Sequence, residues 1–301
     1  MKVLNFGSLN IDHVYNMPHF TEPKETQSSL SYLRNLGGKG LNQSIALAKA
    51  GAEVYHAGRI GADGEIFRTY LEGYGVNTRY LVTNPESVTG HAIIETSDGE
   101  NRIILYGGAN QEIGEAQIDE TLKDFGQGDI LLVQNEISGM GYLLEQAHAK
   151  GMMIVFNTAP MNEKVFSYPL SCVDLFVVNE VEGRALAGSA HTEPNRIMED
   201  LIQKYPDKEL ILTAGTDGAW YYGKGKTVYQ PSFPVKTVDT TAAGDTFTGC
   251  YLAVRLGGGL PEEAMRLAAL ASSMTVQKAG AAQSIPTLDQ VREYEKTKNP
   301  A

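Results

Sequence analysis

Short apolar runs alternate with amphipathic stretches along most of this 301-residue chain. Runs such as "DILLVQ", "MIVFN", "DLFVVN" and "LILTAG" have the length of buried strands, and stretches such as "MGYLLEQAHAKG" and "RIMEDLIQKYP" repeat apolar residues at helical spacing. Strands that alternate with helices are typical of βαβ units. We therefore predict the α/β class, with a doubly wound, mostly parallel sheet flanked by helices.

Two segments, residues 11–36 and 89–107, interrupt this alternation. They contain shorter alternating runs with Pro or Asp-Gly between them, and Asp98-Gly99 predicts a hairpin turn. We expect these segments to form a small β lid inserted into a single domain of residues 1–301, although two ordinary edge hairpins explain the pattern as well. A lid that closes over a substrate excludes water from a transfer reaction.

The charge balance limits the class of partner. The formal net charge is −11, which argues against a nucleic-acid partner, so a bound phosphate would be held by local N–H groups and not by a basic face. The two cysteines and six histidines match no zinc-binding spacing. We expect a small-molecule substrate and no structural zinc.

No feature of the sequence points to a membrane. No apolar run approaches the length of a membrane span, and "MKVLNFGSLN" begins as a strand without the apolar stretch and cleavage site of a signal peptide. We expect a cytoplasmic protein with no membrane partner.

The stretch "VDTTAAGDTFTGCYLAV" places small residues and one carboxylate at the start of a predicted helix. A helix N-terminus offers unpaired N–H groups, and small residues let another molecule approach the backbone. Ala242, Ala243 and Gly244 are therefore candidates for an anion site. Asp245 either caps the helix or acts chemically at that site.

The stretch "NLGGKGLNQSIALAKAG" also leads into a predicted helix. Gly38 and Gly40 would allow the backbone to approach a ligand, and Lys39 and Asn42 could donate hydrogen bonds to hydroxyl groups. The stretch is not a Walker A motif, and the nearest match to one, "GAWYYGKG", fails because Gly225 replaces the required Ser or Thr. Taken alone, such a glycine-rich turn is more often explained by packing at a helix entry.

Together the two stretches resemble the paired signatures of the PfkB carbohydrate kinase family, and within it the ribokinases. The resemblance runs almost end to end through "GSLNIDHVYNMP", "GKGLNQSIALAKAGA", "RIGADGEIF", "TGHAIIE", "GGAN", "VVNEVE", "LTAGTDGAW", "VDTTAAGDTFTG" and "VQKAGAAQSIP". It implies transfer of the γ-phosphate of ATP to a sugar primary hydroxyl, with D-ribose as the first expectation. A kinase for another sugar or a nucleoside stays open; a non-catalytic sugar-binding protein would require a degraded base or anion site, and both motifs are intact.

The resemblance also implies roles for individual residues. Asp245 would be the catalytic base, and the backbone of Ala242, Ala243 and Gly244 would form the anion hole. The residues implied to line the sugar site are Asn10, Asp12, Gly38, Lys39, Gly40, Asn42, Glu136 and Asp245. The residues implied to bind the nucleotide are Asn179, Thr213, Gly215, Thr216, Asp217, Gly218 and Gly244.

The resemblance further implies Mg²⁺ as cofactor, K⁺ as activator and a homodimer formed through the lid sheet. Glu182 would act on Mg²⁺ through water. The positions that match a monovalent-cation site are Asp239, Thr241, Thr275, Lys278, Gly280 and Ser284. The sequence departs from the family pattern at Cys250, where Ala or Gly is usual, and at "TEPKET", which replaces Pro-Gly-Glu-Thr in the first lid segment.

Overall fold

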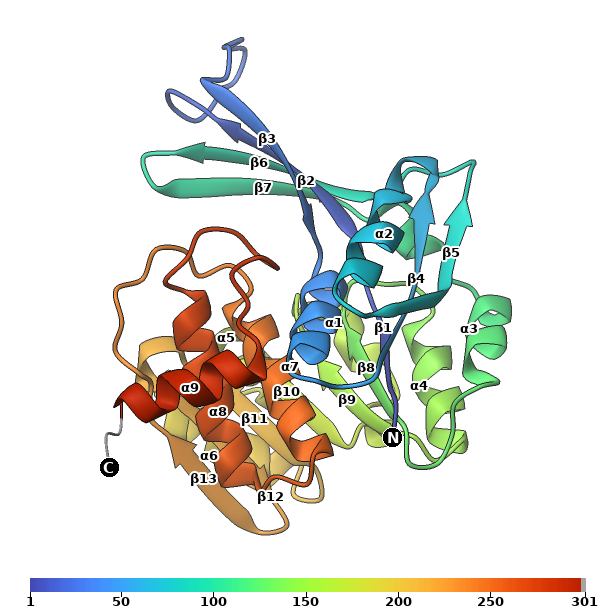
Figure 1. Cartoon of the computed structure of the whole chain (residues 1–301), viewed down its shortest axis with the longest axis vertical. Coiled ribbons are helices and arrows are strands. Elements are labelled where there is room, and N and C mark those ends of the chain that lie inside the picture. Colours follow the sequence, from blue (N-terminus) through green and yellow to red (C-terminus); the bar gives the residue numbers. More distant parts are fainter. Residues whose placement is uncertain (299–301) are drawn as a thin grey trace.

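The computed structural model describes residues 1–298, which form a nine-stranded sheet between two layers of helices (Figure 1). The strands of this sheet are β1 (Val3–Phe6), β4 (Val54–Gly61), β5 (Asn77–Asn84), β8 (Ile130–Gln134), β9 (Met153–Asn157), β10 (Leu175–Asn179), β11 (Glu209–Thr213), β12 (Ala219–Gly223) and β13 (Lys226–Gln230). Their order is β13-β12-β11-β10-β9-β8-β1-β4-β5, and only the β11–β12 and β12–β13 pairs are antiparallel.

The helices are α1 (Lys39–Lys49), α2 (Ile66–Gly73), α3 (Glu115–Leu122), α4 (Met140–Ala149), α5 (Glu180–Ala187), α6 (Pro194–Lys204), α7 (Ala243–Leu256), α8 (Pro261–Thr275) and α9 (Leu288–Lys298). Short 3₁₀ turns are η1 (Ala62–Gly64), η2 (Gly108–Glu112), η3 (Glu163–Ser167), η4 (Leu170–Cys172) and η5 (Gly215–Asp217). Over residues 1–298, no helix combines the length and the apolar character needed to cross a membrane.

Period-2 alternation along the buried strands divides the core into two clusters. In β8, Ile130 and Leu132 join the cluster under α1, α2, α7, α8 and α9, whereas Leu131 and Val133 join the cluster under α3 to α6. Central parallel strands are buried on both faces, which explains their continuous apolar sequences. The predicted α/β class with a mostly parallel, helix-flanked sheet is confirmed.

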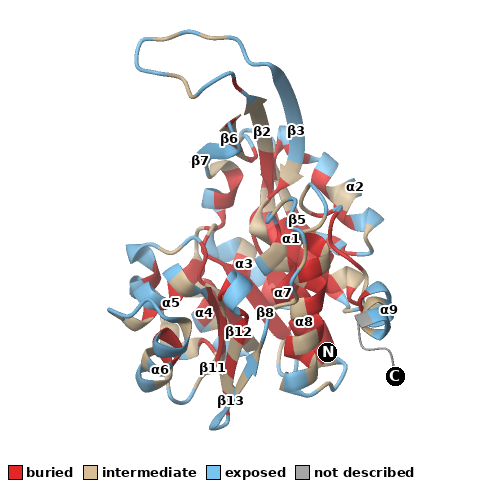
Figure 2. Ribbon diagram, turned by 90° about the vertical axis from the view of Figure 1, so that its left-hand side faces the viewer, coloured by how far each residue is buried: buried red, intermediate tan, exposed pale blue. Residues whose placement is uncertain are grey.

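A second, four-stranded sheet projects from the body and forms the lid (Figures 1 and 2). Its strands are β2 (Asn10–Asn16), β3 (Ser31–Gly37), β6 (Gly90–Ser97) and β7 (Glu100–Tyr106), in the order β3-β2-β6-β7. The β6–β7 hairpin turns at Asp98-Gly99. The predicted β lid is confirmed, whereas the assignment of residues 1–301 to one domain stays a prediction, with residues 299–301 outside the described part.

The altered turn of the first lid segment has an unusual backbone. Lys24 occupies the place of the family's glycine and has a φ of 73°, in the left-handed region that glycine adopts most easily. The turn therefore keeps a conformation suited to glycine although the side chain has changed.

Candidate active site

The candidate residues gather at one end of the nine-stranded sheet. Glu136 and Asn179 lie at or just after the carboxyl ends of β8 and β10, and the loop of residues 213–218 follows β11. The N-terminal turns of α1 and α7 meet at the same end, because Asn42 donates from Nδ2 to Oδ2 of Asp245 over 3.0 Å. The carboxyl edge of a parallel sheet is the usual ligand crevice of open α/β folds.

Two amide side chains hold the carboxylate of Asp245. Asn42 contacts Oδ2, and Gln43 donates from Nε2 to Oδ1 over 2.8 Å. Both donors come from α1, although Asp245 lies in the first turn of α7. The structure therefore joins the two glycine-rich stretches that the sequence singled out.

The backbone before Asp245 is unusual and open. Ala242 has a φ of 62°, and it directly precedes the first residue of α7. A Cβ added to Gly244 would meet no atom within 4 Å, so there is free space beside this turn. The Oγ of Ser272 donates to the carbonyl of Ala243 over 2.5 Å, and Thr248 donates to that of Gly244 over 2.9 Å. These contacts fix the helix start while leaving one side accessible.

The sugar-side candidates lie where the lid meets the body. Asn10 and Asp12 belong to lid strand β2, whereas Glu136 accepts hydrogen bonds from the Ser8 hydroxyl and from the backbone N–H of Lys39, the latter over 3.2 Å. A Cβ on Gly40 would lie 2.4 Å from the backbone nitrogen of Ser8, so this close helix approach requires glycine.

Burial and charge shift the titration of these groups. Burial, with the carboxylate of Glu136 nearby, raises the pKa of Asp12 to about 6. Burial also raises the pKa of Glu136, against the opposing charge of Lys39. Burial disfavours the Lys39 ammonium, but the carboxylates of Asp245, Glu136 and Glu182 together keep its pKa above the ordinary value. Lys39 thus connects the sugar side and the nucleotide side electrostatically.

On the nucleotide side, Asn179 and Glu182 form a capping box at the start of α5. The Asn179 side chain accepts from the Glu182 N–H over 2.9 Å, and the Glu182 carboxylate accepts from the Asn179 N–H over 3.0 Å. Burial raises the pKa of Glu182. The N-x-x-E segment therefore has a structural use, and Glu182 also faces the charge of Lys39.

The loop after β11 contains the remaining nucleotide candidates. It forms η5, with Gly215 at a φ of 49° and Gly218 at 94°. The backbone oxygen of Gln230 would lie 2.4 Å from a Cβ on Gly218, so both conformation and space favour glycine there. The exposed Thr216 and Asp217 lie between these two glycines.

The cation candidates surround two turns of the backbone. Asp239 accepts from the N–H of Thr241 and, with its other oxygen, from the N–H of Gly280, both over 2.9 Å. Thr275 and Ser284 donate their hydroxyls to carbonyls within their own segments. In the described chain, no three or more His, Cys, Asp or Glu side chains are grouped to hold a metal. A cation here would depend on backbone carbonyls.

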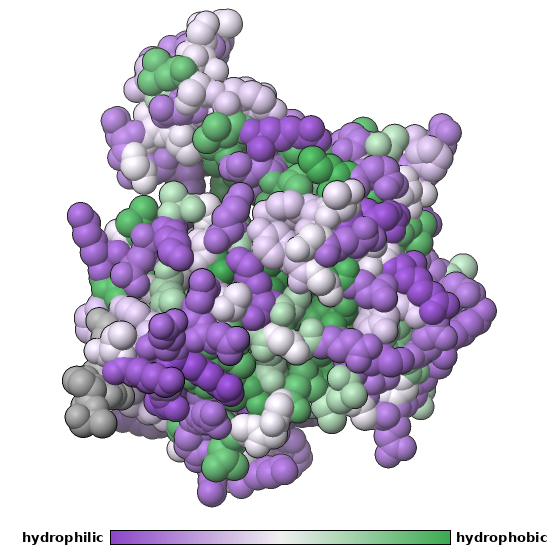
Figure 3. Space-filling model, viewed as in Figure 1, coloured by the Kyte–Doolittle hydropathy of each residue, from purple (hydrophilic) through white to green (hydrophobic). Residues whose placement is uncertain are grey.

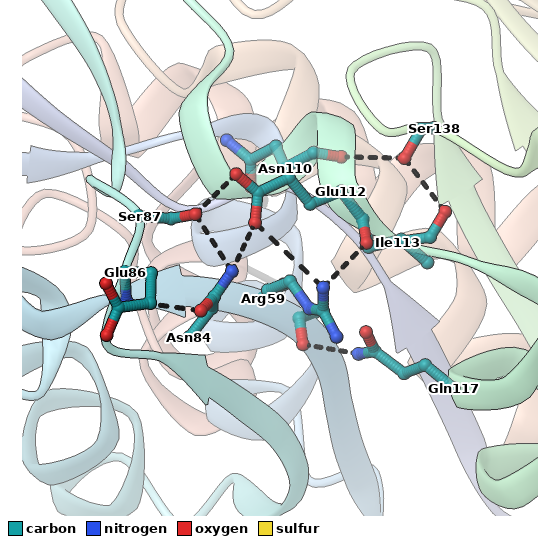
Figure 4. A network of polar contacts seen from close by, with 10 residues as sticks. Arg59, Asn84, Glu86, Ser87, Asn110, Glu112, Ile113, Gln117 and Ser138 are labelled. Atoms are coloured by element: carbon teal, nitrogen blue, oxygen red, sulfur yellow. Dashed lines mark hydrogen bonds and ion pairs between the residues drawn. The ribbon is translucent and has the colours of Figure 1, made fainter.

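Sequence reasoning missed Asn110, which fixes Asn10 at the base of the lid. Asn110 lies in η2 and donates from Nδ2 to Oδ1 of Asn10 over 2.9 Å. Its turn is held by a polar network in which Glu112 accepts from Asn84 and Ser87 (Figure 4). Arg59 donates to the carbonyl of Glu112 over 2.8 Å. The motif "GGAN" contained Asn110, but nothing local indicated its distant partner.

A cavity of about 230 Å³ opens beside the sugar-side candidates. It is lined by Asn10 and Glu136, and by Leu105 from the lid. A larger cavity of about 500 Å³ lies between the ends of α1 and α7 near Gly51 and Gly257, and contains none of the candidates. Asn10 and Glu136 are the only candidates that line the smaller cavity, so it accounts for part of the sugar side of the candidate site and does not reach Asp245.

Comparison with known proteins agrees with this geometry. Residues 1–288 match the model of the pfkB family carbohydrate kinases. The chain is 33% identical to a ribokinase of Haemophilus influenzae, covering 96% of each chain, and 29% identical to a deoxyribokinase of Salmonella typhi, covering 98% of each. The structure of Arabidopsis thaliana ribokinase complexed with ribose and ATP superposes with a TM-score of 0.86 at 28% identity, covering 97% of each chain. This protein belongs to the pfkB family of carbohydrate kinases.

Proposed function

We propose that this chain transfers the γ-phosphate of ATP to the primary hydroxyl of D-ribose. The observation that carries the proposal is the contact between Asp245, at the open N-terminal turn of α7, and Asn42, in the glycine-rich segment of α1. A base and a sugar-binding segment are thereby brought together beside a helix N-terminus, which favours anions. Relatives that carry the names ribokinase and deoxyribokinase support a pentose as the acceptor.

In the reaction, Asp245 takes the proton of the primary hydroxyl while that oxygen forms a bond to the γ-phosphorus. The bond from the γ-phosphorus to the oxygen of ADP breaks, and ADP leaves with the electron pair. The backbone of Ala242, Ala243 and Gly244 forms the anion hole that stabilises the charge on the transferring phosphoryl group. The sugar is oriented by Asn10, Asp12, Gly38, Lys39, Gly40, Asn42 and Glu136.

The nucleotide binds against the loop of residues 213–218 and the start of α7, with Asn179 beside the phosphates. Glu182 would hold Mg²⁺ through water, since Mg²⁺ usually keeps several waters and few protein carboxylates. Mg²⁺ would supply positive charge that neutralises the phosphates. The residues that would hold K⁺, several of them through backbone carbonyls, are Asp239, Thr241, Thr275, Lys278, Gly280 and Ser284, and K⁺ there would stiffen the turn before Asp245. Equal rates in K⁺ and in a large organic cation would remove the K⁺ assignment.

The lid pairs two subunits in this proposal. Every residue of β7 is exposed, and apolar side chains of the lid are visible on its surface (Figure 3). The exposed apolar residues of the lid include Leu33, Ile103, Ile104, Leu105 and Tyr106. A second copy of the lid would cover this apolar area.

A coupled ADP-release assay with D-ribose, 2-deoxyribose, hexoses and nucleosides tests the proposal. We expect the highest kcat/KM with D-ribose and sugar-dependent release of ADP. A preference for deoxyribose, a hexose or a nucleoside would reassign the acceptor, and no sugar-dependent release would overturn the kinase.

A further inference from the structure

A chain of three buried amide side chains leads from the middle of the sheet to Asp245. Asn5 in β1 and Gln134 in β8 are fully buried, and Gln43 in α1 is 1% exposed. Neighbouring positions of these strands carry apolar residues, so three amides in the core require a reason. Hydrogen bonds from Nε2 of Gln134 to Asn5 and to Gln43 link the three amides and offset much of the cost of burying them, although Oε1 of Gln134 has no partner.

The contacts fix the orientation of every amide. Asn5 donates from Nδ2 to the Gly40 carbonyl and to the Ser44 hydroxyl, each over 2.8 Å, so its oxygen remains free to accept. That oxygen accepts from Nε2 of Gln134 over 2.9 Å. The same Nε2 group donates to Oε1 of Gln43 over 2.7 Å. Gln43 must therefore direct its NH₂ group away from Gln134.

The NH₂ group of Gln43 has two acceptors. It donates to Oδ1 of Asp245 over 2.8 Å and to Oδ1 of Asn157 over 3.3 Å. Asn157 is itself oriented, because its Nδ2 donates to the carbonyl of Val177 over 2.9 Å. A flipped Gln43 would place its oxygen against the carboxylate of Asp245 and against the oxygen of Asn157. The network therefore permits one orientation.

We propose that Gln43, oriented by Gln134 and Asn5, is a positioning residue for the carboxylate of Asp245. The inference rests on the proposed function, in which Asp245 is the base. Asn42 binds the other carboxylate oxygen and lies on the proposed sugar-binding segment, whereas Gln43 donates to Oδ1 and is linked to the buried sheet through Gln134. Without Gln43 only Asn42 holds the carboxylate, so fewer molecules present it to the hydroxyl in the reactive geometry.

The first variant is Gln43→Met, which has similar length and no amide. We expect kcat to fall about tenfold, with the KM values for ATP and sugar changed less than about twofold, because Gln43 acts through Asp245 and not on a substrate. Gln43→Glu retains the oxygen that accepts from Gln134 but loses the donor to Asp245. We expect a similar or larger loss of kcat, and this variant replaces Gln43→Met if the latter does not fold.

A double-mutant cycle with Asp245→Asn separates positioning from general damage to the fold. If Gln43 acts through the base, Gln43→Met lowers the residual kcat of Asp245→Asn by less than about twofold. An equal tenfold loss in both backgrounds would overturn the proposal, because the effect would then be independent of the carboxylate.

Gln117→Met is the matched control. Gln117 is a partly buried glutamine of α3 that donates to the carbonyl of Gly58, outside the site, and we expect wild-type kcat for this variant. Wild-type kcat in Gln43→Met and Gln43→Glu would overturn the positioning role alone. Wild-type kcat in Asp245→Asn would overturn the proposed base, and the positioning role with it.

Discussion

The buried floor beneath Asp245 and the lid are built in opposite ways. This floor is formed by the hydrogen-bonded residues Asn5, Gly40, Gln43 and Gln134. Below Asp245, Gln43 of α1 and Gln134 of β8 are buried and linked by a hydrogen bond, and β8 is covered by helices on both faces. In the lid, Ile104 is 68% exposed and all of β7 is exposed. The body holds the carboxylate of Asp245 through two buried side chains of α1, whereas the lid leaves its apolar surface uncovered.

This contrast separates two kinds of substitution. A sheet needs a second layer to bury its apolar face, and the described part of the chain supplies one for the body but not for the exposed lid strand β7. Changes in the floor should therefore alter turnover or stability, and changes in the lid should alter assembly or sugar affinity. The predictions below test this division.

The largest effect should come from Asp245→Asn. The change keeps size but removes the basic carboxylate, so we expect kcat to fall at least about 10²-fold. ATP affinity should stay near wild type. Tm should fall slightly, because Oδ1 and Oδ2 both accept from amide donors and Asn leaves one of those donors facing an NH₂ group. Kinetics, nucleotide titration and thermal melting of this variant check the prediction. A folded variant with near-normal turnover would overturn the catalytic role of Asp245.

Gly40→Ala should damage the floor by sterics. The new Cβ would lie 2.4 Å from the Ser8 nitrogen and 2.5 Å from the Gly7 carbonyl carbon, and both are backbone atoms that cannot move aside easily. Overpacking of this kind costs about 1–3 kcal/mol, so we expect a lower Tm. The control is Gly73→Ala in α2, where a Cβ meets nothing within 4 Å. Equal Tm values for the two variants would refute the steric argument.

The sequence predicted the elements better than it predicted their contacts. The apolar run of β8 and the Asp98-Gly99 turn are local signals, and both gave the correct element. The Gln43–Gln134 bond joins residues 91 positions apart, and the Gln43–Asp245 bond joins residues 202 positions apart. Such contacts depend on the order of the strands in the sheet, which the hydrophobic periodicity of a sequence does not predict.

Local patterns were also ambiguous where one residue has two uses. The N-x-x-E spacing of Asn179 and Glu182 is typical of a helix cap, and the capping box is present. The same Glu182 is buried opposite the charge of Lys39, which the spacing alone did not indicate. The sequence therefore identified the segment, but the chemistry of its carboxylate depends on a residue more than a hundred positions away.

Ile104→Lys tests the lid. If the lid pairs two subunits, a charge in the apolar surface should weaken the dimer at least about tenfold, while Tm of the body changes little. Leu260→Lys is the control, because Leu260 is also 68% exposed but lies at the start of α8. Sedimentation or light scattering over a range of concentrations measures both. A wild-type protein that is monomeric at micromolar concentration would contradict the dimer.

The smallest effect should be a dependence of sugar affinity on the ionisation of Asp12. Its pKa is about 6, so the carboxyl is almost fully ionised at pH 7.5 and about three quarters protonated at pH 5.5. If the ionised form accepts hydrogen bonds from sugar hydroxyls, the KM for sugar should rise up to about fourfold at pH 5.5.

Protonation of Asp12 would not raise the KM for sugar by unfolding the protein. A carboxyl whose pKa is raised on folding stabilises the native state most when protonated, below its unfolded value of 3.8, and this contribution is lost as pH rises through about 6. The titration of Asp12 therefore favours the folded protein at low pH while it weakens sugar binding. Asp12→Asn should have a higher KM for sugar at pH 7.5, and this KM should lack the further rise at pH 5.5. An unchanged pH dependence in Asp12→Asn would assign the effect to another group, such as Glu136.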